Sequence, residues 1–234
     1  MNPPFSTAEF LEVFARYNRE VWPGQVAFSL LAVLVLWLAW RPRERSGMAV
    51  AGVLAFLWAW MGVVYHGWYF SRINPAAYLF AGAFLLQAAL LLHAGLSRAG
   101  PTFRARMDAA GIAGVVMVAY ALIVYPLIGY AVGQRYPAAP TFGLPCPTTI
   151  FTFGVLLWAA PRVPPHLLVI PTAWSVLGVF AARSHGIVQD YALPVAALIA
   201  CGMAVWMRRE ARRAPGGRLG ADPHSCTARS GAPG

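Results

Sequence analysis

The segment MAVAGVLAFLWAWMGVVYHGWYF, residues 48–70, contains no Asp, Glu, Lys or Arg. A transmembrane helix needs roughly 20 mostly apolar residues to cross a hydrocarbon core of about 30 Å, because lipid offers no hydrogen-bond partner to exposed backbone groups. This segment is long enough to make that crossing. It therefore predicts a membrane-spanning helix.

Six further segments extend this pattern along the chain. Three are long and free of acidic and basic side chains, at residues 24–40, 76–96 and 109–132. Two shorter candidates lie at residues 167–182 and 191–207. The last, at residues 148–160, spans a bilayer comfortably only if the preceding Pro145-Cys146-Pro147 enters the membrane with it.

The composition agrees with a membrane location. Of the 234 residues, 59% are hydrophobic and only 11% are charged, which nearly excludes a water-soluble globular protein. The formal net charge is +10, and every one of the 18 basic residues is Arg. A chain that is both apolar and basic predicts a membrane protein with a lipid bilayer as its partner.

Arginine placement distinguishes seven helices from six, because short cytoplasmic loops carry an excess of basic residues. With seven helices and the N-terminus outside, 13 arginines lie on the cytoplasmic side and 5 on the outer side. Without the helix at residues 148–160, the better orientation divides them 11 against 7. We therefore expect an all-α membrane protein, a bundle of about seven transmembrane helices within residues 23–207, with a cytoplasmic C-terminus.

Residues 1–22 predict an amphipathic helix that lies on the outer membrane face. Ser6-Thr7-Ala8-Glu9 fits a capping box, in which the side chains of the first and last residues bond to each other's backbone N–H groups. An apolar stripe follows at helical spacing, formed by Phe10, Leu11, Phe14 and Tyr17.

Residues 208–234 predict a disordered, basic cytoplasmic tail. They are rich in Arg, Gly, Pro and Ala and show no apolar periodicity. Binding to nucleic acid would need a folded reader or an aromatic platform, and the tail sequence offers neither. Its arginines are better explained as topology signals.

Polar residues gather at the predicted outer helix ends, where they make candidate binding groups because polar side chains near a membrane core tend to be functional. The candidates are Asn18, His66, Asn74, Arg135, Cys146 and Asp190. We expect Arg72 and Arg135 to pair with Glu20 and Asp190 across the helix ends, an arrangement that could also hold an anion. The proline-rich loop at 133–147 is expected either to cover an outward-facing cavity or to serve as a rigid connector.

A metal site is not expected. His66, Cys146, His185, Glu20 and Asp190 come singly from separate segments, without the HxxH, HxxxH or CxxC spacing of a metal motif. We interpret Cys146 as a small buried residue and His66 as an interfacial hydrogen-bonding side chain. Cofactors are likewise not expected, and a Cys146 nucleophile activated by His66 is a weaker hypothesis.

Several motifs together resemble a family of bacterial multi-pass membrane proteins catalogued as a domain of unknown function. The most specific is the run from Pro145 to Gly154, PCPTTIFTFG, and others include Ile73-Asn74-Pro75-Ala76-Ala77 and Gln134-Arg135-Tyr136-Pro137. The resemblance covers about residues 5 to 207. It implies the fold and a place in the bacterial inner (plasma) membrane, and it implies no activity.

The sequence does not decide between three possible functions. The leading hypothesis is a protein that binds or passes a small solute or lipid head group through its outer polar face, with Asn74 and Arg135 as contacts. An enzyme of the outer face, metal-dependent in one version, would use His66, Cys146 and Asp190, although we favour a protein that is not an enzyme. The third is a structural membrane subunit, whose outer face would be fully packed.

Overall fold

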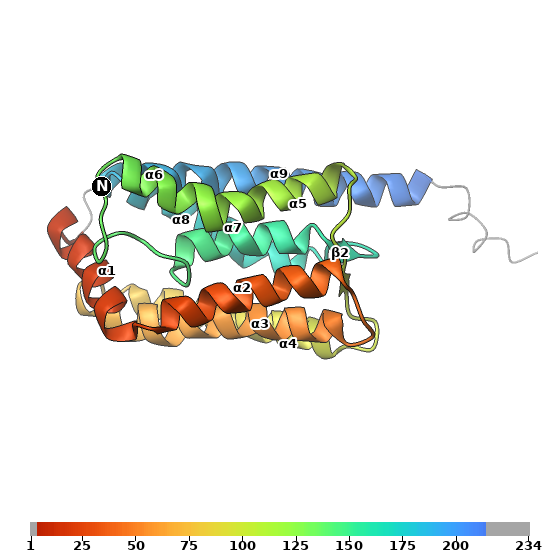
Figure 1. Cartoon of the computed structure of the whole chain (residues 1–234), viewed down its shortest axis with the longest axis horizontal. Coiled ribbons are helices and arrows are strands. Elements are labelled where there is room, and N and C mark those ends of the chain that lie inside the picture. The colour runs from red at the N-terminus through yellow and green to blue at the C-terminus, as the bar shows by residue number, and fades with distance from the viewer. Residues whose placement is uncertain (1–3, 214–234) are drawn as a thin grey trace, which may run out of the picture.

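The computed structural model describes residues 4–213 and is helical along most of that length (Figure 1). The long helices lie side by side in one bundle, and α1 lies across one end of it. The helices are α1 (Thr7–Val21), α2 (Gly24–Trp40), α3 (Ser46–Trp60), α4 (Ala77–Leu96), α5 (Ala109–Ala119), α6 (Tyr125–Ala131), α7 (Pro145–Leu156), α8 (His166–His185) and α9 (Ala192–Arg213).

Five of the helices in the described residues are long and apolar enough to cross a membrane, which is the architecture of an α-helical membrane protein. They are Ser46–Arg72, Ala77–Leu96, Ala109–Ala131, His166–His185 and Val188–Arg213. The pair α1 and α2 would qualify together, but it is bent by 83°. The apolar helix α7 has only 12 residues, so its length is that of a partial crossing.

Although it is short, α7 lies at the centre of the bundle, against α5, α8 and α9. All of its side chains are buried except that of Cys146, which is half-buried. It approaches α5 so closely that a Cβ atom on Gly154 would lie 2.7 Å from the carbonyl oxygen of Gly114. Only glycine allows this separation, so the backbones of α7 and α5 are in direct contact at this point.

The bounds of α7 differ from the predicted helix at residues 148–160. The helix begins at Pro145, because a proline lacks a backbone N–H and is well placed in a first turn. It ends at Leu156, after which β2 (Ala159–Ala160) pairs antiparallel with β1 (Thr102–Phe103). The uncharged run therefore continues beyond the helix itself.

Two of the spans contain π-helical segments that the pattern of apolar residues does not predict. Segment η1 (Met61–Tyr69) continues α3, and η3 (Tyr120–Val124) joins α5 to α6. Pro126, the second residue of α6, lies just beyond η3 and has no N–H to give to the preceding turn, which accounts for irregular hydrogen bonding there. Two short 3-10 segments, η2 (Phe70–Arg72) and η4 (Val188–Tyr191), complete the spans.

In α8, Pro171 leaves the carbonyl oxygen of Leu167 without its helical donor. The side chain of Gln87, fully buried on α4, donates its Nε2 to that oxygen at 2.9 Å. A polar residue near the middle of a predicted transmembrane helix is thus explained by a proline on its neighbour.

Helix α1 begins with the predicted capping box: Oγ of Ser6 accepts from the N–H of Glu9, whose carboxylate accepts from the N–H of Ser6. The predicted stripe faces the bundle, with Phe10, Phe14 and Tyr17 buried against it and Leu11 half-buried. Its apolar face therefore packs on protein.

The last helix is longer than predicted. α9 continues to Arg213, so residues 208–213 of the expected tail are helical. The rest of that tail lies outside the described residues.

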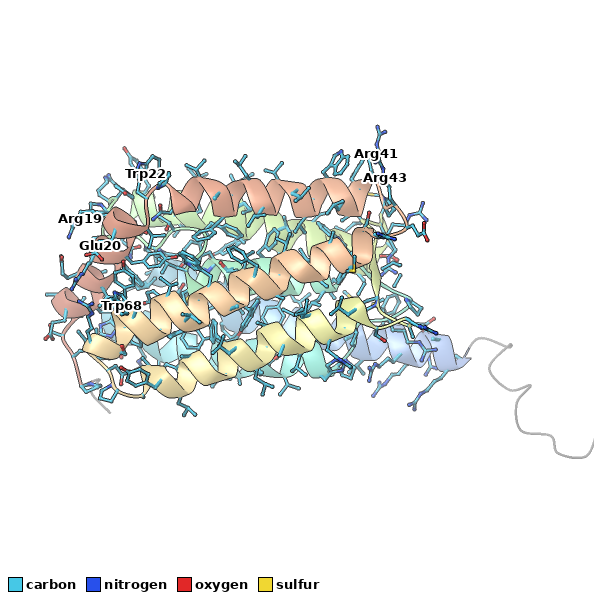
Figure 2. The ribbon with its side chains drawn as sticks, turned by 90° about the horizontal axis from the view of Figure 1, so that it is seen from below. Arg19, Glu20, Trp22, Arg41, Arg43 and Trp68 are labelled. Carbon is cyan, nitrogen blue, oxygen red and sulfur yellow. The ribbon has the colours of Figure 1, made fainter. Side chains whose placement is uncertain are left out.

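The two ends of the bundle carry different side chains (Figure 2). The α1 end, where α1 lies, bears Arg19, Glu20, Trp22 and Trp68. The opposite end, where α2 passes to α3, bears Arg41 and Arg43.

Candidate functional site

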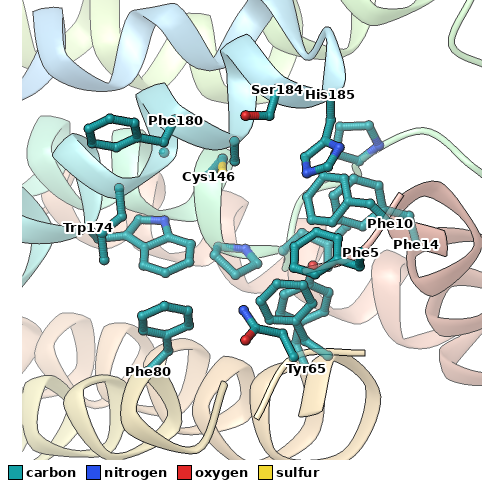
Figure 3. A pocket seen from close by; sticks show the side chains of 18 of the residues that line it. Phe5, Phe10, Phe14, Tyr65, Phe80, Cys146, Trp174, Phe180, Ser184 and His185 are labelled. Atoms are coloured by element: carbon teal, nitrogen blue, oxygen red, sulfur yellow. The ribbon is translucent and has the colours of Figure 1, made fainter. Parts of the chain in front are cut away.

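A cavity of about 720 Å³ lies at the α1 end, where α1, α4, α7 and α8 meet (Figure 3). Its walls are mostly aromatic and aliphatic. From α1 and the residues before it come Phe5, Phe10 and Phe14; from α4 comes Phe80; from α8 come Trp174 and Phe180. A volume of this size with an apolar lining is typical of small-molecule binding sites.

The α8 wall of the cavity reaches the outer surface of the bundle. Leu177 and Phe180 line the cavity, yet 43% and 66% of their surfaces are exposed. Both lie on a helix that is a candidate membrane span. The cavity therefore borders the apolar surface that would face lipid.

A few polar groups line this apolar space. They belong to Tyr65, Asn74, Cys146, Trp174, Ser184 and His185. His185 stacks on Phe10 at a ring separation of 4.4 Å, and its Nδ1 lies 3.2 Å from Oγ1 of Thr7. The described lining residues include no Arg, Asp or Glu.

His66 is not the interfacial hydrogen-bonding residue that we expected. It is fully buried on η1, and neither ring nitrogen has a hydrogen-bond partner within the described part of the chain. Aromatic rings surround it, with centroids at 4.6 Å for Phe84, 5.1 Å for Trp174 and 5.7 Å for Phe80. The sequence placed His66 near the end of a membrane-spanning helix. Because η1 and η2 continue that helix beyond His66, its side chain is buried inside the bundle.

Asn18 holds the loop between α6 and α7 against α1. Its Nδ2 donates to the carbonyl oxygens of Pro137 and Ala139 at 2.6 and 2.8 Å, and its Oδ1 accepts from Oγ1 of Thr141 at 2.8 Å. The side chain is fully buried and uses its hydrogen-bonding capacity within the protein. These contacts describe a positioning residue.

The same loop turns sharply just before α7. Gly143 has a φ of +98°, and a Cβ atom there would collide with the ring of Phe28 on α2. Pro140 before this turn and Leu144 and Pro147 after it line the cavity. The proline-rich segment thus supplies one wall, while α1 covers the end.

Asp190 is buried beside the cavity without lining it. The hydroxyl of Tyr125 donates to its carboxyl group at 2.5 Å, and the thiol of Cys146 lies next to the same group. Nearby, Nε2 of the buried Gln189 donates to Oε1 of Gln134 at 2.6 Å. These groups form a polar cluster between α6, α7 and η4.

The expected ion pairs between Arg72, Arg135, Glu20 and Asp190 are wrong. Arg135 lies over the ring of Tyr130 at 3.7 Å and donates to that residue's carbonyl oxygen, and Arg72 lies over the ring of Trp68 at 5.5 Å. Each arginine contacts its own segment, and neither forms an ion pair with a carboxylate of the described residues, although Arg72 lies near enough to Glu20 to help lower its pKa.

Glu20 instead bonds to Arg16 on the same helix at 2.8 Å and accepts from the hydroxyl of Tyr69 at 2.8 Å. These two hydrogen bonds lower the pKa of Glu20. The carboxylate thereby ties α1 to η1.

The six sequence candidates therefore separate into two groups. Asn74 and Cys146 line the cavity, whereas His66 and Asp190 lie behind its walls, Asn18 positions the loop and Arg135 is on the surface. In residues 4–213, no group of three or more His, Cys, Asp and Glu side chains is placed to hold a metal ion.

Sequence reasoning missed the aromatic walls. The stripe of α1 was visible as a periodic pattern, but it indicated a face toward the membrane surface. Phe80 and Phe180 carry no signal, because a phenylalanine within an apolar run looks the same whether it faces lipid, core or cavity.

Comparisons with known proteins give one match. No curated protein and no solved structure matches the chain. A model of a family of unknown function, DUF6064, matches residues 7–215, which include every helix described above. The chain therefore belongs to the DUF6064 family.

Proposed function

We propose that this protein is an integral membrane protein that binds a lipid-like small molecule in the cavity at the α1 end. The observation that carries the proposal is the cavity itself, about 720 Å³ of aromatic-walled space bordered by the exposed side chains of Leu177 and Phe180. Transfer of apolar surface from water or interface into such a space is favourable. A molecule with a hydrocarbon portion fits this lining better than the free head group expected from sequence.

The packed middle of the bundle favours binding over passage. Trp58 is fully buried, stacks near Phe84 at 4.5 Å and donates its indole N–H to Oγ1 of Thr152 at 3.0 Å. Trp174 meets Phe84 edge-on at 5.0 Å. These rings fill the space below the cavity, where a permeation path would have to continue.

The topology within this proposal has seven crossings, with α2 and α7 added to the five long spans and the α1 end outside a bacterial inner membrane. The arginine distribution supports it, since turns at the opposite end carry Arg41, Arg43 and Arg45 and α9 ends in Arg212 and Arg213.

Thiol labelling tests this orientation. In a cysteine-free background, Glu12→Cys on α1 should react with a membrane-impermeant reagent in intact spheroplasts, and Glu44→Cys should react only after permeabilisation. Both positions are exposed, so access differs only by side. The reverse pattern would invert the topology.

Ligand binding is tested with a photoreactive chain. A diazirine-bearing hexadecyl probe, added to the purified protein in micelles, should label cavity residues of α1, α7 and α8. Ala181 lines the cavity, so Ala181→Phe should reduce this labelling at least tenfold, because the larger ring occupies the site.

The matched control is Ala173→Phe. It makes the same change at an exposed position of α8 that is not part of the cavity lining, and it should leave labelling unchanged. Equal labelling of both variants and the native protein, spread over the whole exposed surface, would show that the probe dissolves around the bundle and would refute the proposed site.

A further inference from the structure

We infer that the ligand carries an uncharged carbonyl-type acceptor next to its apolar portion, and that this acceptor bonds to the indole N–H of Trp174. The inference rests on the proposed function, since it names the chemistry of the molecule in the same cavity. It depends on which hydrogen-bonding groups the walls leave without partners.

Trp174 supplies the first of these groups. Its Nε1 is buried and has no acceptor among residues 4–213, although the ring lines the cavity. An indole nitrogen can only donate, and a buried donor without an acceptor costs about 1–3 kcal/mol. The indole faces the sulfur of Cys146, which is only a weak acceptor.

The ring of Trp174 is held in place by its neighbours. Phe80, Phe84 and His66 meet it edge-on at centroid separations of 5.6, 5.0 and 5.1 Å. The N–H therefore keeps one direction. A ligand acceptor can meet this donor without the entropic cost of ordering a flexible side chain.

Asn74 adds a second donor on another wall. Its Oδ1 already accepts from the backbone N–H of Ala76 at 3.1 Å, which leaves the amide NH₂ as the free part of the side chain. The hydroxyl groups of Tyr65 and Ser184 also line the cavity and can donate as well as accept. The cavity thus offers donors on several walls, while the amide oxygen of Asn74 is in use. A complementary ligand presents acceptors.

The charge of the walls limits what that acceptor can be. The lining described above has no acidic residue and no arginine, and the ring of His185 stacks with the rings of Phe5 and Phe10. An ionised group moved into apolar surroundings without a counter-charge is strongly disfavoured. A neutral ester, ketone or quinone oxygen satisfies both requirements.

Competition against the hexadecyl photoprobe tests this inference. Three competitors of equal chain length are added at the same mole fraction in micelles: heptadecane, 2-heptadecanone and heptadecylammonium. For the native protein, 2-heptadecanone should reduce labelling at about one-tenth of the concentration that heptadecane needs, which is the effect of one hydrogen bond. The ammonium compound should be no better than heptadecane.

Trp174→Phe removes the N–H and keeps an aromatic ring. The probe should still label this variant, but the advantage of the ketone over the hydrocarbon should fall to less than threefold. Trp206→Phe, at a half-exposed position of α9 far from the cavity lining, should keep the full advantage.

The outcomes separate the two proposals. If the probe labels the cavity and all three competitors act equally, the inference about the acceptor is overturned while the proposed site stands. The same conclusion follows if the ammonium compound competes best, or if Trp174→Phe keeps the tenfold advantage. If the probe does not label the cavity in any protein, the proposed function itself fails.

Discussion

Most of the buried polar atoms that lack a hydrogen-bond partner lie at the α1 end of the bundle. At the opposite end, most polar side chains are exposed or hydrogen-bonded. Within the described residues, buried atoms without partners belong at the α1 end to Gln25, His66, Thr149, Trp174 and Gln189. Elsewhere they belong to Gln87 and to Arg106, whose Nε still lies 3.1 Å from the carboxylate of Asp108.

This difference separates two uses of polar residues in one bundle. An unsatisfied buried group costs free energy and so needs an explanation such as a ligand or a bound water. Arg41, Arg43 and Arg45 at the opposite end need no such explanation, because they lie in an exposed turn. The distribution of the arginines is the basis of the proposed orientation, and the candidate site lies at the end with fewer charges.

The largest expected effect comes from releasing the loop at the α1 end. Asn18→Ala removes the hydrogen bonds to the carbonyl oxygens of Pro137 and Ala139 and the acceptor for Thr141. At about 1 kcal/mol for each bond, we expect a loss of about 3 kcal/mol in the free energy of unfolding. Thermal unfolding in micelles, together with proteolysis of residues 133–144, measures it.

Asn18→Asp serves as the comparison. It keeps the acceptor for Thr141 but places carboxylate oxygens against two carbonyl oxygens, so it should be at least as destabilising as Asn18→Ala. A stable Asn18→Asp variant with a protected loop would contradict the positioning role of Asn18.

The next effect tests whether the polar cluster behind the cavity stabilises the α1 end. Tyr125→Phe removes the hydroxyl that donates to the buried carboxyl group of Asp190. We expect a loss of about 2 kcal/mol in unfolding free energy, since the remaining carboxyl group stays buried with fewer partners. Tyr78→Phe, at an exposed position of α4, should change stability by less than about 0.5 kcal/mol.

Part of this architecture follows from sequence. The segment predicted at residues 76–96 forms a helix over Ala77–Leu96, and the predicted capping box is present at Ser6 and Glu9. Both depend on features that the local sequence carries in full: an uncharged apolar run with polar flanks, and a pair of side chains three residues apart. The family resemblance was also correct, because it relied on several motifs spread along the chain.

The candidate site depends on how far each helix is rotated about its axis, which the local sequence does not carry. The nine-residue π segment η1 changes that rotation and turns His66 into an aromatic cluster. Arg135 and Asp190 were placed at the same end correctly, but a stacked partner one turn away satisfies Arg135 first. The end of the bundle at which these side chains lie could be predicted, whereas their contacts with other helices could not.

The third effect tests whether the middle of the bundle is closed by satisfied polar groups. Gln87→Leu leaves the carbonyl oxygen of Leu167 without a donor, and the loss in unfolding free energy should be about 1 kcal/mol, as for other hydrogen bonds between membrane helices. Pro171→Ala restores a backbone N–H to that oxygen. In the Pro171→Ala background, Gln87→Leu should therefore cost less.

Equal costs of Gln87→Leu in the two backgrounds would contradict the link between Gln87 and Pro171. The double-mutant cycle isolates that link, because the two side chains act on one carbonyl oxygen. Reversible unfolding in mixed micelles gives the four free energies that the cycle needs.

The smallest effect concerns the first turn of α1. Hydrogen bonds from the backbone and side chain of Ser6 lower the pKa of Glu9 below 4.5, so the stabilisation they give is present above the unfolded value and is lost as pH falls through the folded one. Ser6→Ala should make amide exchange in this turn about fivefold faster at neutral pH. Because Glu20 also titrates on α1, only the difference between variant and native protein reports on Glu9. That difference should shrink as the pH is lowered below 4.5. A difference that stays constant would mean that the ionised carboxylate of Glu9 contributes nothing to the capping box.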